Sequence, residues 1–121
     1  MLRIGIIGAG DGGASILKTF LAMEEVEIIG ICDKNKSAEG IKIAKSNNIR
    51  VYNNFEKLLN KSGEKIILEV TGNNELSKMV KEKADEKTKI IDSETSLVIF
   101  KIVKSRENVL NKIENEAENL S

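Results

Sequence analysis

Glycines gathered in one short segment are the residues of this chain best suited to binding chemistry. Gly8, Gly10 and Gly13 have the spacing G-x-G-x-x-G and directly follow an apolar run. Glycine permits a tight turn at the first position, close approach of a phosphate to the backbone at the second, and close packing of the next helix at the third. The free N–H groups and positive dipole end of that helix favour an anion. The segment therefore predicts a site for the pyrophosphate of a dinucleotide.

An acidic residue supplies the second part of the pattern. Asp33 lies 20 residues after Gly13 and closes the next apolar run. A carboxylate at the end of a second strand accepts hydrogen bonds from both ribose hydroxyls of an adenosine, and it repels a 2′-phosphate. Asp33 therefore predicts NAD as the cofactor in preference to NADP, with a discrimination that Lys34 and Lys36 would soften.

Asp11 complicates this interpretation because it stands beside the expected pyrophosphate. Two like charges about 5 Å apart repel by roughly 3 kcal/mol at an effective dielectric constant near 20. The side chain would have to turn to solvent for a dinucleotide to bind. The alternative is that Asp11 stabilises the start of a helix next to an empty site. The sequence supports the two alternatives about equally.

Alternating apolar segments position these residues. Such alternation predicts an α/β fold: a doubly wound parallel sheet of the Rossmann type, three layers deep, with an extra helix at the C-terminal end. We expect strands at Leu2–Ile7, Glu27–Cys32, Val51–Tyr52, Ile66–Val70 and Thr88–Ile91, and helices after the glycines, from a Ser37 cap through Ala44, over Phe55–Leu59, from Asn74 to Lys83 and from about Ser93 or Leu97 onward.

Ligands of such sheets bind outside the carboxyl ends of the strands, where the strand order reverses. The glycine-rich loop, the end of the second strand and the turn after the fourth strand meet at that edge. The residues predicted to bind the dinucleotide are Gly8, Ala9, Gly10, Asp11, Gly12, Gly13, Asp33, Lys34, Thr71, Gly72 and Asn73.

Length and charge limit the classes of function. The 121 residues suffice for one core but not for a cofactor domain plus a substrate domain. We expect a Rossmann domain at 1–103 and a separate helix at 104–121. The 19 basic and 19 acidic residues cancel and are interspersed, which argues against nucleic-acid and membrane partners. Met1 leads directly into the first strand, and no apolar run approaches the ~20 residues of a membrane span, so we expect a cytoplasmic protein.

Groups suited to catalysis are few. The chain has no histidine, and no cluster has metal-ligand spacing. Cys32 lies in an apolar run and is expected to be a buried core residue. Glu69 is unusual because a carboxylate in a buried strand is costly unless it is paired; we expect it to face solvent or a helix N–H rather than to catalyse. Asp92 and Glu94 are expected to cap the helix that begins near Ser93.

Five segments together resemble a known family. They are GIIGAGDGG, VEIIGICDKN, AEGIKIAKSNNIRVYNNFEKLL, IILEVTGNNEL and KIIDSETSLVIFKIV, within roughly residues 2–103. They are similar to the NAD-binding Rossmann domains at the amino end of bacterial signalling proteins, which precede a PAS sensor and a histidine-kinase or sigma-54-activator output. More loosely, they are similar to the cofactor domains of homoserine, aspartate and glucose-fructose type dehydrogenases.

The resemblance implies roles for particular residues. The three glycines would hold the pyrophosphate, Asp33 the adenosine ribose, and the turn Thr71–Asn73 would lie near the nicotinamide. Glucose-fructose type dehydrogenases carry Glu-Lys-Pro after the fifth strand, whereas this chain has Ser93-Glu94-Thr95. The departure gives no support to catalysis of that kind.

The last 20 residues carry a second pattern, a heptad seam of about three repeats. The seam predicts a homodimer through Leu110, Ile113 and Leu120, or a helix that relays a signal to a downstream signalling domain. The alternative is a terminal helix that packs on its own sheet or frays. The seam consists of Val103, Arg106, Leu110, Ile113, Ala117 and Leu120, with Arg106 as its flaw.

These observations predict an NAD(H)-binding Rossmann module that senses a ligand and has no chemistry of its own. Two hypotheses compete with it. One is the cofactor domain of an NAD-dependent oxidoreductase that lacks its substrate domain, and the other is a structural Rossmann unit with an empty site.

Overall fold

A five-stranded parallel sheet forms the centre of the molecule. The computed structural model describes residues 1–120, of which Leu120 is described in its backbone alone. The strand order is β3-β2-β1-β4-β5, and every neighbouring pair is parallel. The strands are β1 (Leu2–Ile7), β2 (Val26–Cys32), β3 (Val51–Tyr52), β4 (Lys65–Glu69) and β5 (Thr88–Ile91), each within one residue of its expected bounds.

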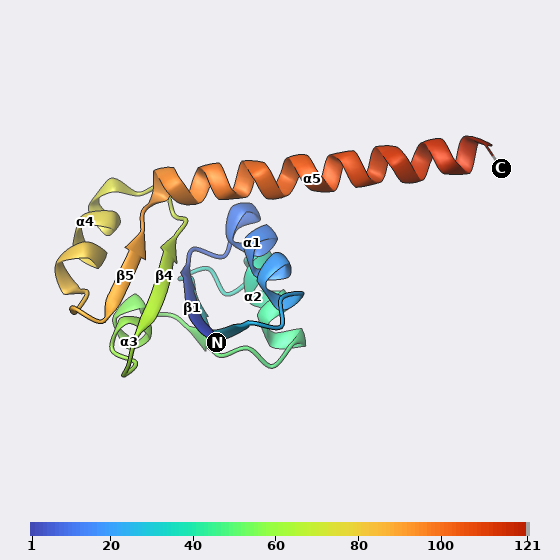
Figure 1. The fold of residues 1–121 in the computed structure, drawn as a ribbon. Helices are drawn as coiled ribbons and strands as arrows, with labels where there is room; N and C mark the ends of the chain where they lie inside the picture. Colours follow the sequence, from blue (N-terminus) through green and yellow to red (C-terminus); the bar gives the residue numbers. More distant parts are fainter. Residues whose placement is uncertain (121) are drawn as a thin grey trace.

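Helices cover both faces of the sheet (Figure 1). One face packs against α1, α2 and the first part of α5, and the other against α3 and α4. The predicted three-layer Rossmann-type α/β fold is thereby confirmed. The helices are α1 (Asp11–Leu21), α2 (Glu39–Ser46), α3 (Phe55–Leu59), α4 (Asn74–Lys83) and α5 (Ser93–Leu120).

The apolar runs of the central strands are continuous because both faces of these strands are buried. Ile6 of β1 packs with Ile16 of α1 in one cluster. Its neighbour Ile7 packs with Leu58 of α3 in the other cluster. The two clusters pack the sheet on both faces beneath the loops at its carboxyl edge.

The start of α2 differs from the sequence-based expectation. The helix begins at Glu39, and its cap residue Ala38 makes no side-chain hydrogen bond. Ser37 is not the cap, because it precedes Ala38, and its N–H donates to Asn35 Oδ1 at 3.0 Å in the preceding turn. The position of the helix start is set instead by the N–H of Gly40, which donates to the Ala9 carbonyl at 2.7 Å.

One uninterrupted helix, α5, ends the described chain. It starts at Ser93, so the alternative start at Leu97 is wrong, and it runs without a break across the expected boundary between residues 103 and 104. Asp92 caps it as expected, because its Oδ1 accepts the Thr95 N–H at 2.9 Å. This hydrogen bond holds the pKa of Asp92 below its usual value.

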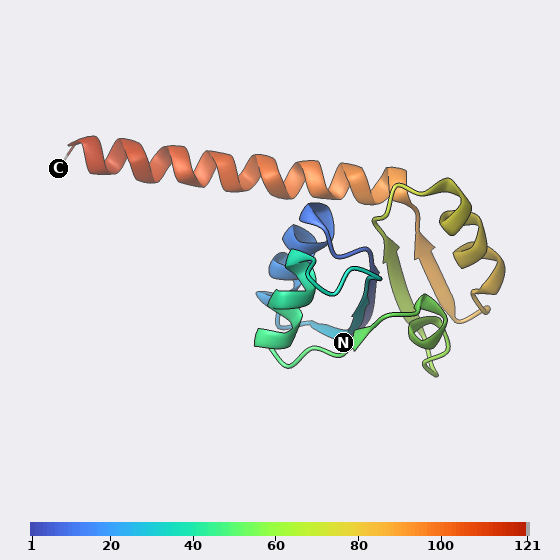
Figure 2. The ribbon, with the colours of Figure 1, turned by 180° about the vertical axis from the view of Figure 1, so that it is seen from behind.

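The second half of α5 extends beyond the body, and every residue from 108 to 119 is exposed (Figures 1 and 2). Within the described chain, no helix is both long enough and apolar enough to span a membrane.

Candidate functional site

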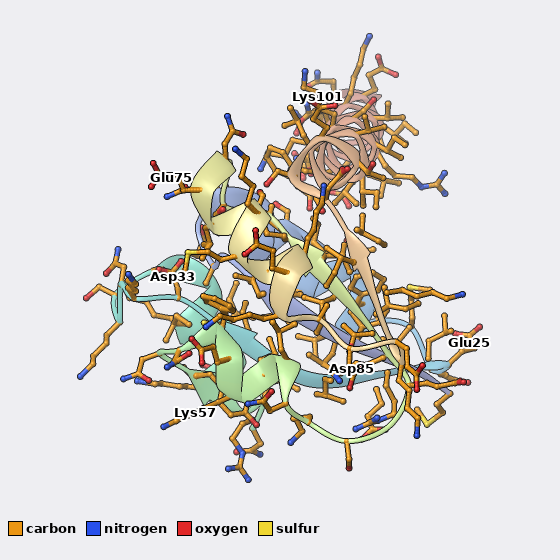
Figure 3. All side chains as sticks on the ribbon, turned by 90° about the vertical axis from the view of Figure 1, so that its left-hand side faces the viewer. Glu25, Asp33, Lys57, Glu75, Asp85 and Lys101 are labelled. Carbon is orange, nitrogen blue, oxygen red and sulfur yellow. The ribbon has the colours of Figure 1, made fainter. Side chains whose placement is uncertain are left out.

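The strand order reverses at β1, between β2 on one side and β4 on the other. A cleft of about 760 Å³ opens above the carboxyl ends of these strands. Figure 3 shows Asp33 and Glu75, which line the cleft, on one side of the molecule, and Glu25 and Asp85 at the opposite end. The lining consists of Ile7, Gly8, Gly10, Cys32, Asp33, Lys34, Asn53, Asn54, Phe55, Glu56, Val70, Thr71, Asn73, Glu75, Leu76 and Met79.

The structure brings six of the eleven predicted binding residues to the wall of this cleft: Gly8, Gly10, Asp33, Lys34, Thr71 and Asn73. The other five lie beneath or beside it. Ala9 and Gly13 are buried under the loop, Gly12 is half-buried, and Asp11 and Gly72 are exposed.

Each glycine of the loop meets a different constraint. Gly8 has a φ of +106°, a conformation that L side chains rarely adopt. A Cβ on Gly13 would lie 1.9 Å from the Gly8 carbonyl oxygen, so α1 packs on the turn too closely for any side chain. A Cβ on Gly10 would have no heavy atom within 4 Å, because this position opens on the cleft. The three environments fit a turn, a phosphate-facing backbone and a helix contact.

The amino end of α1 presents backbone donors to the cleft. Its cap residue is Gly10, and no side chain caps the helix. The N–H groups of the first turn are therefore available to an anion, with the helix dipole in support. Asp11 in this turn is exposed, which is compatible with both alternatives for its role.

Asp33 is held firmly beside the glycine-rich loop. Its Oδ2 accepts the N–H of Ala9 at 2.8 Å, and its Oδ1 accepts the N–H of Asn35 at 2.8 Å. Each carboxylate oxygen can accept a further hydrogen bond. Asp33 therefore has both the position and the remaining acceptor capacity to bind ribose hydroxyls.

A smaller hollow of about 390 Å³ lies on the other side of Asp33. Lys36, Lys45 and Lys57 line it together with Tyr52. The sequence indicated Lys36, but not the other two lysines, which belong to α2 and to α3. These three ammonium groups would attract a negatively charged substituent placed near Asp33.

Glu69 overturns the expectation that it faces solvent or a helix N–H. Its side chain is buried, with 1% exposed, at the carboxyl end of β4. It accepts hydrogen bonds from the hydroxyls of Ser77 and Ser93 and from the Thr71 N–H. Burial raises the pKa of Glu69, but these hydrogen bonds outweigh burial and bring the pKa below its usual value. The carboxylate is charged and satisfied because α4 and α5 each supply a serine.

The same network holds the turn that follows β4. The Gly72 N–H donates to Ser93 Oγ at 3.2 Å, so the first residue of α5 contacts this turn directly. Asn73 accepts the Leu76 N–H at 3.1 Å and thereby caps α4. One carboxylate and one hydroxyl therefore connect the wall of the cleft to the start of α5. No local sequence pattern indicates the serines, which lie 8 and 24 residues from Glu69.

Cys32 is buried, as expected, at the base of the cleft. Burial and the neighbouring charge of Asp33 raise the pKa of its thiol to about 11. Because the reactive form of cysteine is the thiolate, this side chain is suited to packing rather than to nucleophilic chemistry at neutral pH.

Comparison with protein families agrees with the loop geometry. Residues 2–93 match the model of an oxidoreductase family with an NAD-binding Rossmann fold. The chain belongs to this family. The matched segment contains the glycine-rich loop, Asp33 and Glu69, and it ends at the first residue of α5.

Among solved structures, the chain is similar to an NAD-binding protein from Listeria innocua, with 19% identity and a TM-score of 0.57. The similarity covers 88% of this chain and 33% of that chain. At this identity it shows the fold alone, and the present chain spans about a third of that protein's length. A search of curated proteins finds no match.

Proposed function

We propose that this chain is an NAD(H)-binding regulatory module, in which α5 transmits the presence of the dinucleotide and no reaction is catalysed by the chain itself. The observation that carries the proposal is the hydrogen-bond network of Glu69. It joins the turn Thr71–Asn73 at the cleft to Ser93, the first residue of α5.

The proposed binding mode follows from the shape of the cleft. Its volume of about 760 Å³ lies in the usual range of small-molecule sites, about 300 to 1,000 Å³. The pyrophosphate would lie against Gly10 and the start of α1, and the adenosine ribose would bind to Asp33. The nicotinamide would then approach the turn Thr71–Asn73. Asp33 supports NAD over NADP, since its carboxylate repels a 2′-phosphate.

Transmission to α5 requires that the ligand favour one arrangement of this turn. The Gly72 N–H and Ser93 Oγ are 3.2 Å apart, so a displaced turn loses this bond and loosens the start of α5. Couplings between sites are typically worth about 1 to 3 kcal/mol. In this proposal α5 passes the change to a second copy of the chain or to a downstream signalling domain.

A second candidate function is the cofactor domain of an NAD-dependent oxidoreductase. Membership of an oxidoreductase family favours it, as does the longer neighbour, of which this chain covers 33%. In that case the residues that bind and transform a substrate come from another segment or another subunit.

Calorimetric titration with NAD, NADH, NADP and AMP tests binding. We expect NAD or NADH, which lack the 2′-phosphate, to bind best. AMP should bind more weakly because it lacks the second half of the ligand. Equal or tighter binding of NADP would contradict the assignment to Asp33. The absence of binding by all four compounds would favour a structural unit.

Amide hydrogen exchange separates the two candidate functions. A regulatory module should change exchange in the first turns of α5 when it binds the dinucleotide, whereas a cofactor domain needs no such change. Ser93→Ala is the matched variant, because it removes the hydroxyl that bonds both Gly72 and Glu69. The variant should still bind the dinucleotide but lose the response of α5.

A further inference from the structure

One exposed flank of α5, beside the surface that packs on the body, is apolar. Val98, Ile102, Val109 and Ile113 are each more than half exposed, at 57%, 63%, 54% and 56%. At about 100° of rotation per residue they fall within roughly 60° of arc. They therefore form one stripe, which we call the α5 face. A contiguous exposed stripe of large aliphatic side chains is a feature of interaction surfaces.

The α5 face differs from the seam that the sequence indicated. Val103, the first residue of that seam, is half-buried, while Ile102 beside it is exposed. Packing against the body turns the helix so that the exposed seam starts at Ile102. The side chain of Leu120, the last residue of the predicted seam, lies outside the described residues. The exposed heptad seam consists of Ile102, Arg106, Val109, Ile113 and Glu116.

The two charges in this seam decide how it can pair with a copy of itself. A parallel, in-register pair places Arg106 against Arg106 and Glu116 against Glu116, so like charges face each other at two layers. An antiparallel pair centred on Asn111 places Arg106 opposite Glu116 on both sides of the centre. Residue 111 is also the midpoint of Val109 and Ile113, so these two aliphatic side chains meet in the same arrangement.

Neighbouring antiparallel registers lack this match. A shift by one heptad in one direction sets Arg106 opposite Val109, and a shift in the other direction sets Ile113 opposite Glu116. Both shifts bury a charge against an aliphatic side chain, which is costly. The register centred on Asn111 combines ion pairs with aliphatic layers.

We propose that two copies of this chain pair through the α5 face as an antiparallel dimer, with its two-fold axis at the height of residue 111 along the helix, between the layers of Val109 and Ile113. The interface is isologous, because each copy contributes the same residues. The two bodies lie at opposite ends of the helix pair, since the half-buried residues of α5 end at Glu107. Both clefts stay open to solvent. The proposal does not depend on dinucleotide binding.

Charge reversal in the full-length protein tests the pairing. Arg106→Glu places glutamates at both layers, and Glu116→Arg places arginines there, so each variant should weaken dimerisation at least about tenfold. The double variant restores opposite charges and should return the dissociation constant to within about threefold of the original. Analytical ultracentrifugation measures the constants, and circular dichroism confirms that each helix is retained.

Glu114→Lys is the matched control, because residue 114 is exposed and lies about 120° around the helix from the middle of the seam. It should leave dimerisation unchanged. A full-length protein that stays monomeric at about 100 μM would overturn the proposal. Single charge reversals that leave dimerisation unchanged would also overturn it, because a parallel pair or an interface on the body would give that result.

Cysteine cross-linking tests the orientation. A mixture of Val109→Cys and Ile113→Cys chains should form a disulfide between different copies, while each variant alone should not. Self-linking of Val109→Cys alone would indicate a parallel pair and overturn the antiparallel arrangement. The native Cys32 does not interfere under native conditions because it is buried.

Discussion

The two sides of the cleft are built by different means. On the β1 side the wall is backbone: Gly10 has open space where a side chain would be, and α1 begins without a side-chain cap. On the β4 side the wall is held by a buried carboxylate, Glu69, which accepts hydrogen bonds from Thr71, Ser77 and Ser93. The first wall leaves its donors for a ligand, whereas the second uses its polar groups within the protein.

This difference suits the proposed regulatory role, in which the first wall would bind the dinucleotide and the second would transmit its presence to α5. Backbone donors around glycine can bind an anion without rearrangement of side chains. A buried charge, in contrast, is stable only when all its partners are in place, so it keeps several elements in one arrangement. No buried side-chain nitrogen or oxygen within the described part of the chain lacks a partner. Displacement of the turn at the cleft therefore disturbs a network that reaches α5.

The largest expected effect is on the free energy of unfolding, and it should differ between two glycines of the same loop. Gly13→Ala should lower the free energy of unfolding by about 4 kcal/mol, because its Cβ would lie 1.9 Å from the Gly8 carbonyl oxygen and α1 would have to move. Gly10→Ala is the control, with an expected change below about 1 kcal/mol, since its Cβ meets nothing within 4 Å. Urea denaturation measures both. Equal losses would mean that the two positions are not constrained differently.

Gly10→Val should weaken binding about a hundredfold while it preserves the fold. The added methyl groups would occupy the space proposed for the pyrophosphate, with an expected loss of about 3 kcal/mol in binding free energy for NAD(H). Calorimetry and urea denaturation on the same sample separate the two effects. Unchanged affinity would show that the ligand does not lie on this loop.

On the opposite wall, Glu69→Ala should lower the free energy of unfolding by about 2 to 4 kcal/mol at pH 7, because it leaves the serine hydroxyls and the Thr71 N–H without their acceptor. Glu27→Ala removes an exposed carboxylate from β2 and serves as the control, with a change within about 0.5 kcal/mol. Similar losses in the two variants would contradict the role assigned to the network.

The contribution of Glu69 should also depend on pH with a definite sign. Its pKa is lower in the folded protein than the usual value of about 4.3 for an unfolded chain. The ionised form therefore stabilises the fold above about pH 4, and this stability is lost as the pH falls through the folded pKa. Denaturation of the original protein and of Glu69→Gln across pH 3 to 7 should show a difference that narrows on acidification.

On the β1 side of the cleft, Asp33 allows a finer test of cofactor specificity. Asp33→Asn should reduce the preference for NAD over NADP by about 2 kcal/mol, because it removes the repulsion of the 2′-phosphate and leaves Lys36, Lys45 and Lys57 nearby. Calorimetry with both dinucleotides measures the ratio. Lys57→Gln in the Asp33→Asn background should restore part of the preference, and a ratio that neither substitution changes would place the ribose elsewhere.

The last prediction concerns Asp11 and distinguishes its two alternative roles. If its charge opposes the pyrophosphate, Asp11→Asn should tighten binding by about 1 to 3 kcal/mol, with a larger gain at low ionic strength. If Asp11 only stabilises the start of α1, binding should hardly change and the unfolding free energy should fall slightly. Glu39→Gln, at the exposed start of α2, is the control for a nonspecific effect of charge.

Local patterns in the sequence were enough to predict the fold class and the residues of the β1 side of the cleft. The glycine spacing is a short-range requirement, since Gly8 and Gly13 meet across a single turn. The apolar runs of the central strands indicate burial on both faces, and their alternation with helical segments indicates a covered parallel sheet. The position of Asp33 at the cleft could be predicted because this residue stands at the end of such a run. These features depend on neighbours within a few residues, so their signal is present in the chain itself.

The tertiary structure alone decided the opposite wall and the exposed face of α5. The charge of Glu69 is stable because Ser77 and Ser93 arrive from two different helices. The heptad pattern predicted a seam through Val103, but packing on the body half-buries that residue and leaves Ile102 exposed. A helix has apolar positions on more than one face, and the sheet determines which of them it covers. Such contacts join residues far apart in sequence, and no local pattern records them.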